Sequence, residues 1–224
     1  FFEYAETIPG LTTDTMADLA RELGIHIIAP IFEYDPRSRL YYNAAPLVGP
    51  SGVVGLYRKR HIPSTPYGLE KQYFTPGNLG YPVFETPHGR IGILICYDRH
   101  FPESFRHLAY HGAEIVFTCV NSMTDFSKRN WSMEVRTNAM CNGVFIVQTN
   151  PVGQEGTARL FGRTMIVDPR GEVVGELGDS DEGTLSAELN LDAIGRARMQ
   201  YNVIRDMDPA DLGLRPQPVG VPPA

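Results

Sequence analysis

The stretch RIGILICYDRHFPESFRHLAYHGAEIVFTCV, residues 90–120, changes its pattern twice. It opens with an apolar run that stops at Cys96, which predicts a buried strand. Pro102 suits the first turn of a helix and Gly112 suits its stop, so we expect a helix over 102–111. The apolar run AEIVFTCV (113–120) then predicts a second buried strand. A strand, a helix and a strand in succession are typical of an α/β fold.

The rest of the chain continues this alternation. Residues 12–24 predict a helix with one apolar stripe, and residues 60–82, rich in Pro and Gly, predict a long loop of the kind that often carries function. We expect one α/β domain over 1–212, with helices on the faces of a mixed sheet, and an extended tail over 213–224. The other expected elements are strands at 25–34, 144–150 and 183–191, hairpins at 41–59, 81–96 and 162–177, and a helix at 130–143.

The composition narrows the classes of partner. A formal net charge of -6 argues against general attraction to nucleic acid or to an anionic membrane, although residues 56–63 (LYRKRHIP) form a local basic cluster. No apolar run approaches the length of a membrane span. Three widely spaced cysteines argue against a disulfide framework and for a reducing compartment, so we expect a cytoplasmic protein.

Cys96 has two interpretations. A lone cysteine at the end of an apolar strand is most often a buried core residue. The strand ends at this cysteine, however, and a helix begins soon after it, which places helix N-terminal amides near the sulfur. Arg99 is close in sequence and, like those amides, favours the thiolate. Cys119 and Cys141 fall inside a predicted strand and a predicted helix, and we interpret both as structural.

Lys59 also has two interpretations. A basic run at the end of a strand is usually a solvated edge, but this one opens the long loop, and Pro63 restricts the chain after it. A lysine held there is suited to stabilise a developing oxyanion. His107 and His111 have a metal-ligand spacing on one helix, but no third ligand is evident, and we interpret them as surface residues.

Taken together, these segments resemble the carbon–nitrogen hydrolase (nitrilase) superfamily, and within it the N-carbamoyl amino acid amidohydrolases that include β-ureidopropionase. The similarity covers nearly the whole chain in the family's order, and its combination of motifs is more specific than any single one. The matching stretches are AETIPGLTTDTMADLARELGI, YYNAAPLVGPSGVVGLYRKRHIP, EKQYFTPGNLGYPVFETPHGRIGILICYDRHFPE, GAEIVF and GRTMIVDPRGEVV.

The resemblance implies a four-layer α-β-β-α sandwich whose subunits pair into a homodimer or a larger homo-oligomer. It also implies a Glu–Lys–Cys triad that needs no metal or organic cofactor. By motif match, Cys96 is the nucleophile, Lys59 is the triad lysine, and Glu70 is a second glutamate beside the triad. In this scheme Lys59 and the backbone N–H of Tyr97 stabilise the oxyanion.

Two more residues are assigned to the substrate by the same resemblance. Arg99 occupies a position where a guanidinium holds the substrate carboxylate in relatives that act on carbamoyl amino acids. Relatives resembling N-carbamoylputrescine amidohydrolase tend to have Gln there. The alternative for Arg99 is a structural salt bridge with Asp98 or Glu103. Asn121 matches a region that lines the pocket.

Two features depart from the family pattern. In relatives the triad glutamate ends an early strand well before the AETIPG segment, and here Glu3 and Glu6 come too late to match it. We therefore expect these 224 residues to be a piece of a longer chain that supplies the glutamate and the N-terminal strands. Residues 120–135 also differ from the ureidopropionase-like pattern beside the pocket, which leaves the substrate open.

The leading hypothesis is a thiol amidohydrolase that converts an N-carbamoyl amino acid, such as N-carbamoyl-β-alanine, to the amino acid, ammonia and carbon dioxide. In this chemistry the Cys96 thiolate attacks the ureido carbonyl carbon, and a carboxylate base takes the thiol proton and later activates water. The alternatives are an aliphatic amidase, a nitrilase, an N-carbamoylputrescine-type amidohydrolase, or a non-catalytic family member. In every catalytic case the partner is a small molecule.

Overall fold

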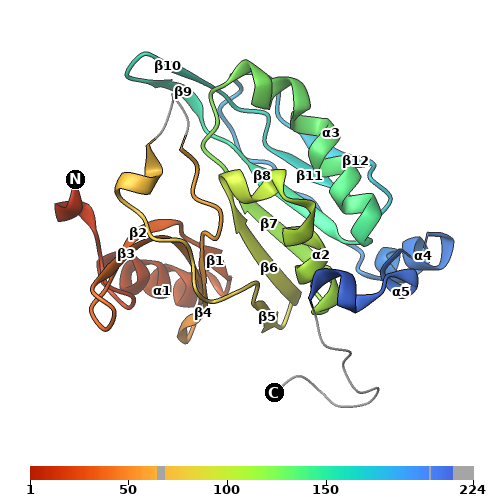
Figure 1. Ribbon diagram of the computed structural model, residues 1–224, viewed down its shortest axis with the longest axis horizontal. Helices are drawn as coiled ribbons and strands as arrows, with labels where there is room; N and C mark the ends of the chain where they lie inside the picture. Colours follow the sequence, from red (N-terminus) through yellow and green to blue (C-terminus); the bar gives the residue numbers. More distant parts are fainter. Residues whose placement is uncertain (65–68, 202, 214–224) are drawn as a thin grey trace.

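The computed structural model describes residues 1–64, 69–201 and 203–213, and its two main β-sheets face each other (Figure 1). The helices are α1 (Leu11–Leu23), α2 (Pro102–Tyr110), α3 (Asp125–Asn142), α4 (Asp192–Gln200) and α5 (Val203–Asp206). The strands are β1 (Ile27–Ile28), β2 (Ile31–Asp35), β3 (Leu40–Gly49), β4 (Gly52–Arg58), β5 (Val83–Thr86), β6 (Gly89–Ile95), β7 (Ile115–Cys119), β8 (Phe145–Thr149), β9 (Val152–Glu155), β10 (Ala158–Phe161), β11 (Met165–Val167) and β12 (Val173–Glu176).

The first sheet is built around β3 and is antiparallel. β1 and β2 pair with one edge of β3 and β4 pairs with the other, as the predicted 41–59 hairpin requires. The expected single strand over 25–34 is divided at Ala29–Pro30 into β1 and β2. Proline has no N–H to donate to a neighbouring strand, which accounts for the interruption.

The second sheet has the strand order β12-β11-β8-β7-β6-β5, and its three central strands are parallel. In the register of this sheet Ile95 pairs with Cys119 and Cys119 pairs with Thr149. The carboxyl ends of β6, β7 and β8 therefore lie at one edge, which is where parallel sheets gather their ligand-binding groups. The predicted hairpins 81–96 and 162–177 are present as β5–β6 and β11–β12.

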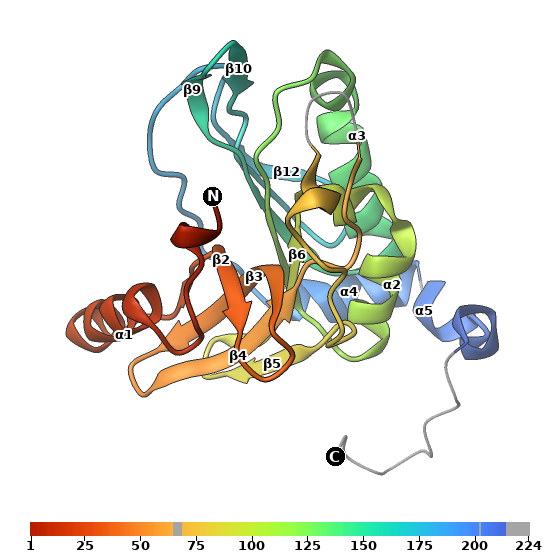
Figure 2. The ribbon, with the colours of Figure 1, turned by 60° about the vertical axis from the view of Figure 1, so that its left-hand side comes forward.

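Four layers follow from the packing of helices on these sheets (Figure 2). α1 packs on β3 and β4, whereas α3 packs on β8 and β11 and also contacts α2. A continuous core joins the sheets and helices, with Leu47 and Tyr57 from the first sheet, Ile93 from the second, and Leu108 and Trp131 from the helices. The predicted α/β fold, an α-β-β-α sandwich, is confirmed.

Some boundaries differ from the sequence predictions. α3 begins earlier than expected, because the Thr124 side chain caps it by accepting a hydrogen bond of 3.1 Å from the backbone N–H of Ser127. The predicted strand over 183–191 is wrong. Its apolar residues Leu189 and Leu191 pack against the cluster of Ile115 and Phe145, but the segment forms no strand. Of the predicted tail, residues 214–224 lie outside the described residues.

The loop predicted over 60–82 contains a short 3₁₀ helix, η2 (Glu70–Gln72). A two-stranded hairpin of β9 and β10, which the sequence did not predict, follows the carboxyl end of β8. Among the described residues, no helix is long and apolar enough to cross a membrane.

Candidate active site

Cys96 stands directly after β6, at the first position of the 3₁₀ helix η3 (Cys96–His100). Its φ of 46° lies in the left-handed region, which L-residues other than glycine rarely adopt. Backbone strain of this kind persists only where the surrounding structure enforces it, and it is concentrated at functional sites. The thiol is half-buried and lines a cavity. These features favour the interpretation of Cys96 as a reactive thiol over that of a core residue.

The turn that carries Cys96 is fixed by Asp98, whose carboxylate is fully buried. One carboxylate oxygen accepts hydrogen bonds from the Tyr57 hydroxyl at 2.7 Å and the Ile95 N–H at 3.1 Å. The other accepts from the backbone N–H of His61 at 2.9 Å and contacts the His61 ring nitrogen Nδ1 at 2.8 Å. Burial, followed by the charge of Asp98, raises the pKa of Tyr57 well above its usual value, so the phenol remains a donor. Asp98 thus joins the Cys96 turn to the chain on both sides of Lys59.

Lys59 follows β4 directly and is buried. Its backbone N–H donates to the Asn43 carbonyl and its own carbonyl accepts from the Gly77 N–H, both at 2.8 Å. Its Nζ donates to both carboxylate oxygens of Glu70, at 2.9 and 2.6 Å. The structure therefore brings together two of the residues expected in the site, as an ion pair whose ammonium is fully buried.

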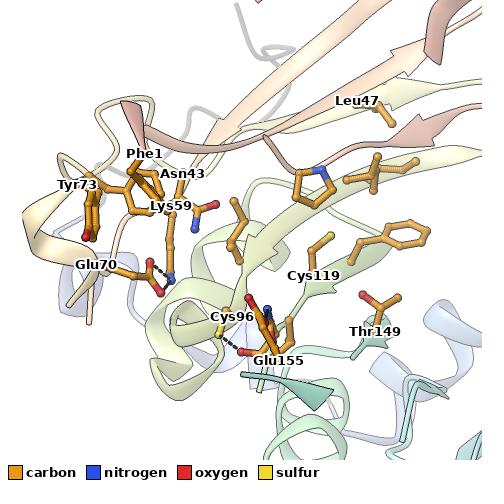
Figure 3. A pocket seen from close by; sticks show the side chains of 18 of the residues that line it. Phe1, Asn43, Leu47, Lys59, Glu70, Tyr73, Cys96, Cys119, Thr149 and Glu155 are labelled. Atoms are coloured by element: carbon orange, nitrogen blue, oxygen red, sulfur yellow. Dashed lines mark hydrogen bonds and ion pairs between the residues drawn. The ribbon is translucent and has the colours of Figure 1, made fainter. Parts of the chain in front are cut away.

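A cavity of about 870 Å³ between the two sheets connects this pair to the thiol. In Figure 3 the side chains of Lys59 and Glu70 meet on one side of the cavity, and Cys96 faces the same space. A thiol nucleophile next to a fixed ammonium donor is suited to attack a carbonyl carbon and to stabilise the resulting oxyanion.

The carboxyl ends of β7 and β8 supply the opposite wall. The carbonyl oxygen of Asn121 lies 3.7 Å from Cys96 Sγ, and the Asn121 amide nitrogen donates at 3.4 Å to Glu155 on β9. Asn121 thus lines the cavity, as expected from the sequence. Glu155 was not singled out from the sequence, although its place just beyond a parallel strand is where ligand groups are expected.

A second cavity, of about 680 Å³, is also lined by Glu70, Cys96 and Asn121. Tyr97 lies in its wall, where its ring packs edge-on against Phe101. Two cavities therefore share the thiol between them.

Arg99 lies in the wall of the second cavity, but its pairing differs from both expectations. Its guanidinium donates to Glu134 of α3, which no sequence motif indicates, rather than to Asp98 or Glu103. The side chain is only 2% exposed, so it does not present an open fork for a substrate carboxylate. No pattern in the sequence links position 99 to position 134, because the two helical segments meet only in the folded chain.

Cys141 lies in a helix, as predicted, whereas Cys119 lines the first cavity together with Cys96. Cys119 ends β7 and Cys141 lies in α3. Burial raises the pKa of the Cys119 thiol to about 12, which keeps it protonated and unreactive at neutral pH. Among the described residues, no group of three or more His, Cys, Asp or Glu side chains is arranged to hold a metal ion.

The fold and this site define a class: an α/β sandwich in which a cysteine thiol and a lysine–glutamate pair line one cavity. The family model of carbon–nitrogen hydrolases matches residues 1–199. A solved structure of a carbon–nitrogen hydrolase from Helicobacter pylori G27 superposes with a TM-score of 0.82 and 30% identity, covering 91% of this chain and 76% of that one.

Two relatives carry more specific names. An N-carbamoylputrescine amidase of Solanum lycopersicum is 36% identical over 225 residues, or 93% of this chain and 74% of that protein. A β-ureidopropionase of Arabidopsis thaliana is 36% identical over 155 residues, or 68% of this chain and 38% of that protein. The chain belongs to the carbon–nitrogen hydrolase family, as the sequence resemblance indicated. It is a hydrolase acting on carbon–nitrogen bonds other than peptide bonds.

Proposed function

We propose that this enzyme hydrolyses the ureido group of a small N-carbamoyl amine, releasing ammonia, carbon dioxide and the free amine. The observation that carries the proposal is the shared cavity in which Cys96 faces the Lys59–Glu70 pair. The similarity to proteins named N-carbamoylputrescine amidase and β-ureidopropionase supports the ureido group as the target.

The proposed reaction proceeds in two stages. The Cys96 thiolate attacks the ureido carbonyl carbon, and Lys59 stabilises the negative charge on its oxygen. The carbon–nitrogen bond to the unsubstituted nitrogen breaks, the proton from the thiol goes to that nitrogen, and ammonia leaves. A thioester remains on Cys96.

Water then attacks the thioester carbonyl and releases the thiol, which regains its proton. The product is an N-carboxy amine, and this decomposes to carbon dioxide and the amine. A carboxylate base is required in both stages, first to accept the thiol proton and then to activate water. Glu70 is held by Lys59 through both oxygens, which suits it to position the ammonium.

N-carbamoyl-β-alanine is the second candidate substrate. The sequence favoured it through Arg99, and the similarity to β-ureidopropionase favours it as well. The ion pair of Arg99 with Glu134 weakens the first of these arguments, because the guanidinium already has a carboxylate partner. The expected homodimer and the expected cytoplasmic location remain predictions; sedimentation velocity tests the first.

An assay with four substrates tests the proposal: N-carbamoylputrescine, N-carbamoyl-β-alanine, a simple aliphatic amide and a nitrile. We expect the two ureido compounds to give ammonia and carbon dioxide in equal amounts, and Cys96→Ser to reduce turnover by roughly a thousandfold or more. Cys141→Ser is the matched control and should retain activity, because Cys141 lies in α3 and lines neither cavity. A higher kcat/KM for the amide or the nitrile, or unchanged turnover in Cys96→Ser, would contradict the proposal.

A further inference from the structure

The second cavity contains a charged cluster that the proposed reaction does not use. It consists of Arg99, His100 and Glu134, which line this cavity, whereas Lys59 does not. We propose that Glu134 determines which substrate tail the enzyme accepts, by excluding carboxylate tails and admitting ammonium or uncharged ones. This inference rests on the proposed function, since it concerns the part of the substrate beyond the ureido group.

Glu134 contacts two charged neighbours, one with each of its carboxylate oxygens. Oε2 accepts from the Arg99 guanidinium, and Oε1 lies 2.8 Å from Nδ1 of His100. The face of the Trp131 ring covers the guanidinium, with its central carbon 5.0 Å from the ring centroid. Glu134 and Trp131 both come from α3, so one helix supplies the counter-ion and the apolar cover for the same arginine.

The exposure of these side chains indicates which of them a ligand contacts first. The side chain of Arg99 is 2% exposed, whereas those of Glu134 and His100 are 20% and 23% exposed. Burial lowers the pKa of Arg99, and the charge of Glu134 opposes that effect. A cation this deeply buried needs its counter-ion, because an unpaired buried charge is strongly destabilising. Glu134 is therefore held in place, and a substrate meets its carboxylate before it reaches the guanidinium.

The charge of the tail then decides the outcome. A carboxylate tail is repelled by Glu134, and it gains the guanidinium only by displacing that side chain. An ammonium tail is attracted to the same carboxylate and leaves the buried pair intact. The other charged groups of the cavity do not reverse this preference, because the Glu70 carboxylate is paired with a buried cation, Lys59, in the same way and also repels a carboxylate tail. The ring nitrogen Nδ1 of His100 is already engaged by Glu134.

Two substrates of similar length test the inference directly: N-carbamoylputrescine, with an ammonium tail, and N-carbamoyl-γ-aminobutyrate, with a carboxylate tail. The readout is the ratio of their kcat/KM values. We expect the natural enzyme to favour the ammonium tail. Glu134→Gln keeps the shape of the side chain, removes the repulsion and frees the guanidinium, so the ratio should fall by roughly tenfold or more.

Glu114→Gln is the matched control. Glu114 pairs with Arg90 at 3.0 Å and is also 20% exposed, but it lies outside both cavities, so its variant should keep the ratio of the natural enzyme. Two results would overturn the inference: a natural enzyme that prefers the carboxylate tail, or a Glu134→Gln ratio within about twofold of the original.

A second measurement needs no variant, and so it decides the matter even where Glu134→Gln fails to fold. Butylamine and butanoate are compared as protectants of Cys96 against iodoacetamide. Butylamine should protect at lower concentration, and stronger protection by butanoate overturns the inference. An enzyme that hydrolyses no ureido compound contradicts the proposed function, while this protection assay still reports the charge preference of the cavity.

Discussion

The carboxylate of Asp98 accepts a hydrogen bond of 2.7 Å from the hydroxyl of Tyr57, a residue 41 positions earlier in the chain. Tyr57 lies on β4 of the first sheet, and Asp98 lies in the turn that follows β6 of the second. The bond therefore links the strand that ends just before Lys59 to the turn that begins at Cys96. This link between the sheets holds Lys59 and Cys96 in position relative to each other.

Asp98→Asn should weaken both stability and activity. Each carboxylate oxygen of Asp98 accepts hydrogen bonds. In asparagine one of these oxygens is replaced by an NH₂ group, which cannot accept, so the donors on that side are left buried and unpaired. We expect a loss of about 1–3 kcal/mol in the free energy of unfolding, measured by urea denaturation. kcat should fall more than KM rises, because the reacting groups are displaced while the cavity remains. Asp168→Asn, in a turn that lines neither cavity, is the control, and an equal loss of kcat there would argue against a positioning role.

Lys59→Gln should reduce kcat by roughly a hundredfold, the usual effect of removing one oxyanion donor. The neighbouring Lys71 is exposed in η2, so Lys71→Gln removes the same charge without touching the pair with Glu70. Steady-state kinetics on the preferred ureido substrate provide the measurement. If both variants lose activity equally, general electrostatics rather than a fixed donor would explain the effect of Lys59.

Iodoacetamide should label Cys96 well before Cys119. Both thiols line the cavity, but the raised pKa of the Cys119 thiol, about 12, leaves almost no Cys119 thiolate between neutral pH and about pH 10. Peptide mass spectrometry of samples quenched over time gives the two rates. Equal rates in the folded chain would favour the non-catalytic alternative, and labelling in urea should abolish the difference.

The raised pKa of the Cys119 thiol also predicts that stability falls at alkaline pH. The unfolded chain ionises Cys119 at its ordinary pKa of 9.0, whereas the folded chain keeps it protonated until about 12. This group's contribution to stability is therefore complete below about pH 9 and is lost as the pH rises through that interval. Urea midpoints at neutral and alkaline pH measure the loss, which should be smaller in Cys119→Ala. An equal alkaline loss in that variant would exclude Cys119 as a cause.

Gly55→Ala should destabilise the contact between the sheets. A Cβ at Gly55 on β4 would lie 2.2 Å from the ring of Phe84 on β5, so the ring or one of the two strands has to shift. We expect a loss of about 1–3 kcal/mol in urea denaturation, as for other overpacked cores. Gly183→Ala is the control, because its Cβ would meet nothing within 4 Å. A change of less than about half a kcal/mol at Gly55 would show that the ring moves freely.

Much of the fold was predictable, because its signals are local. The apolar runs that became β6 and β7, the glycine stops of α1 and α2, and the hairpin turns all depend on neighbouring residues. The strand predicted over 183–191 failed for the opposite reason. Alternating apolar residues show that a segment packs against a core, and they do not show that another strand is available to pair with it.

The site was predictable only where motif and chemistry coincide. Cys96, Lys59 and Glu70 stand in recognisable motifs, and the structure places them around one cavity. Glu134 and Glu155 are ordinary surface-type residues in the sequence, and only the packing of α3 and the β9–β10 hairpin brings them to that region. At Arg99 the motif is visible in the sequence, but the buried partner Glu134 is not, so the ion pair could not be predicted.

The left-handed backbone at position 96 favours other residues than the cysteine that the proposed reaction requires. Glycine and asparagine are the residues best suited to a φ of 46°, so a library randomised at this codon and screened for soluble protein should become enriched in them. Screened for growth on a ureido compound as the nitrogen source, the same library should retain cysteine alone. The difference between the residues recovered from the two screens shows how far the reaction, rather than folding, determines the residue at position 96.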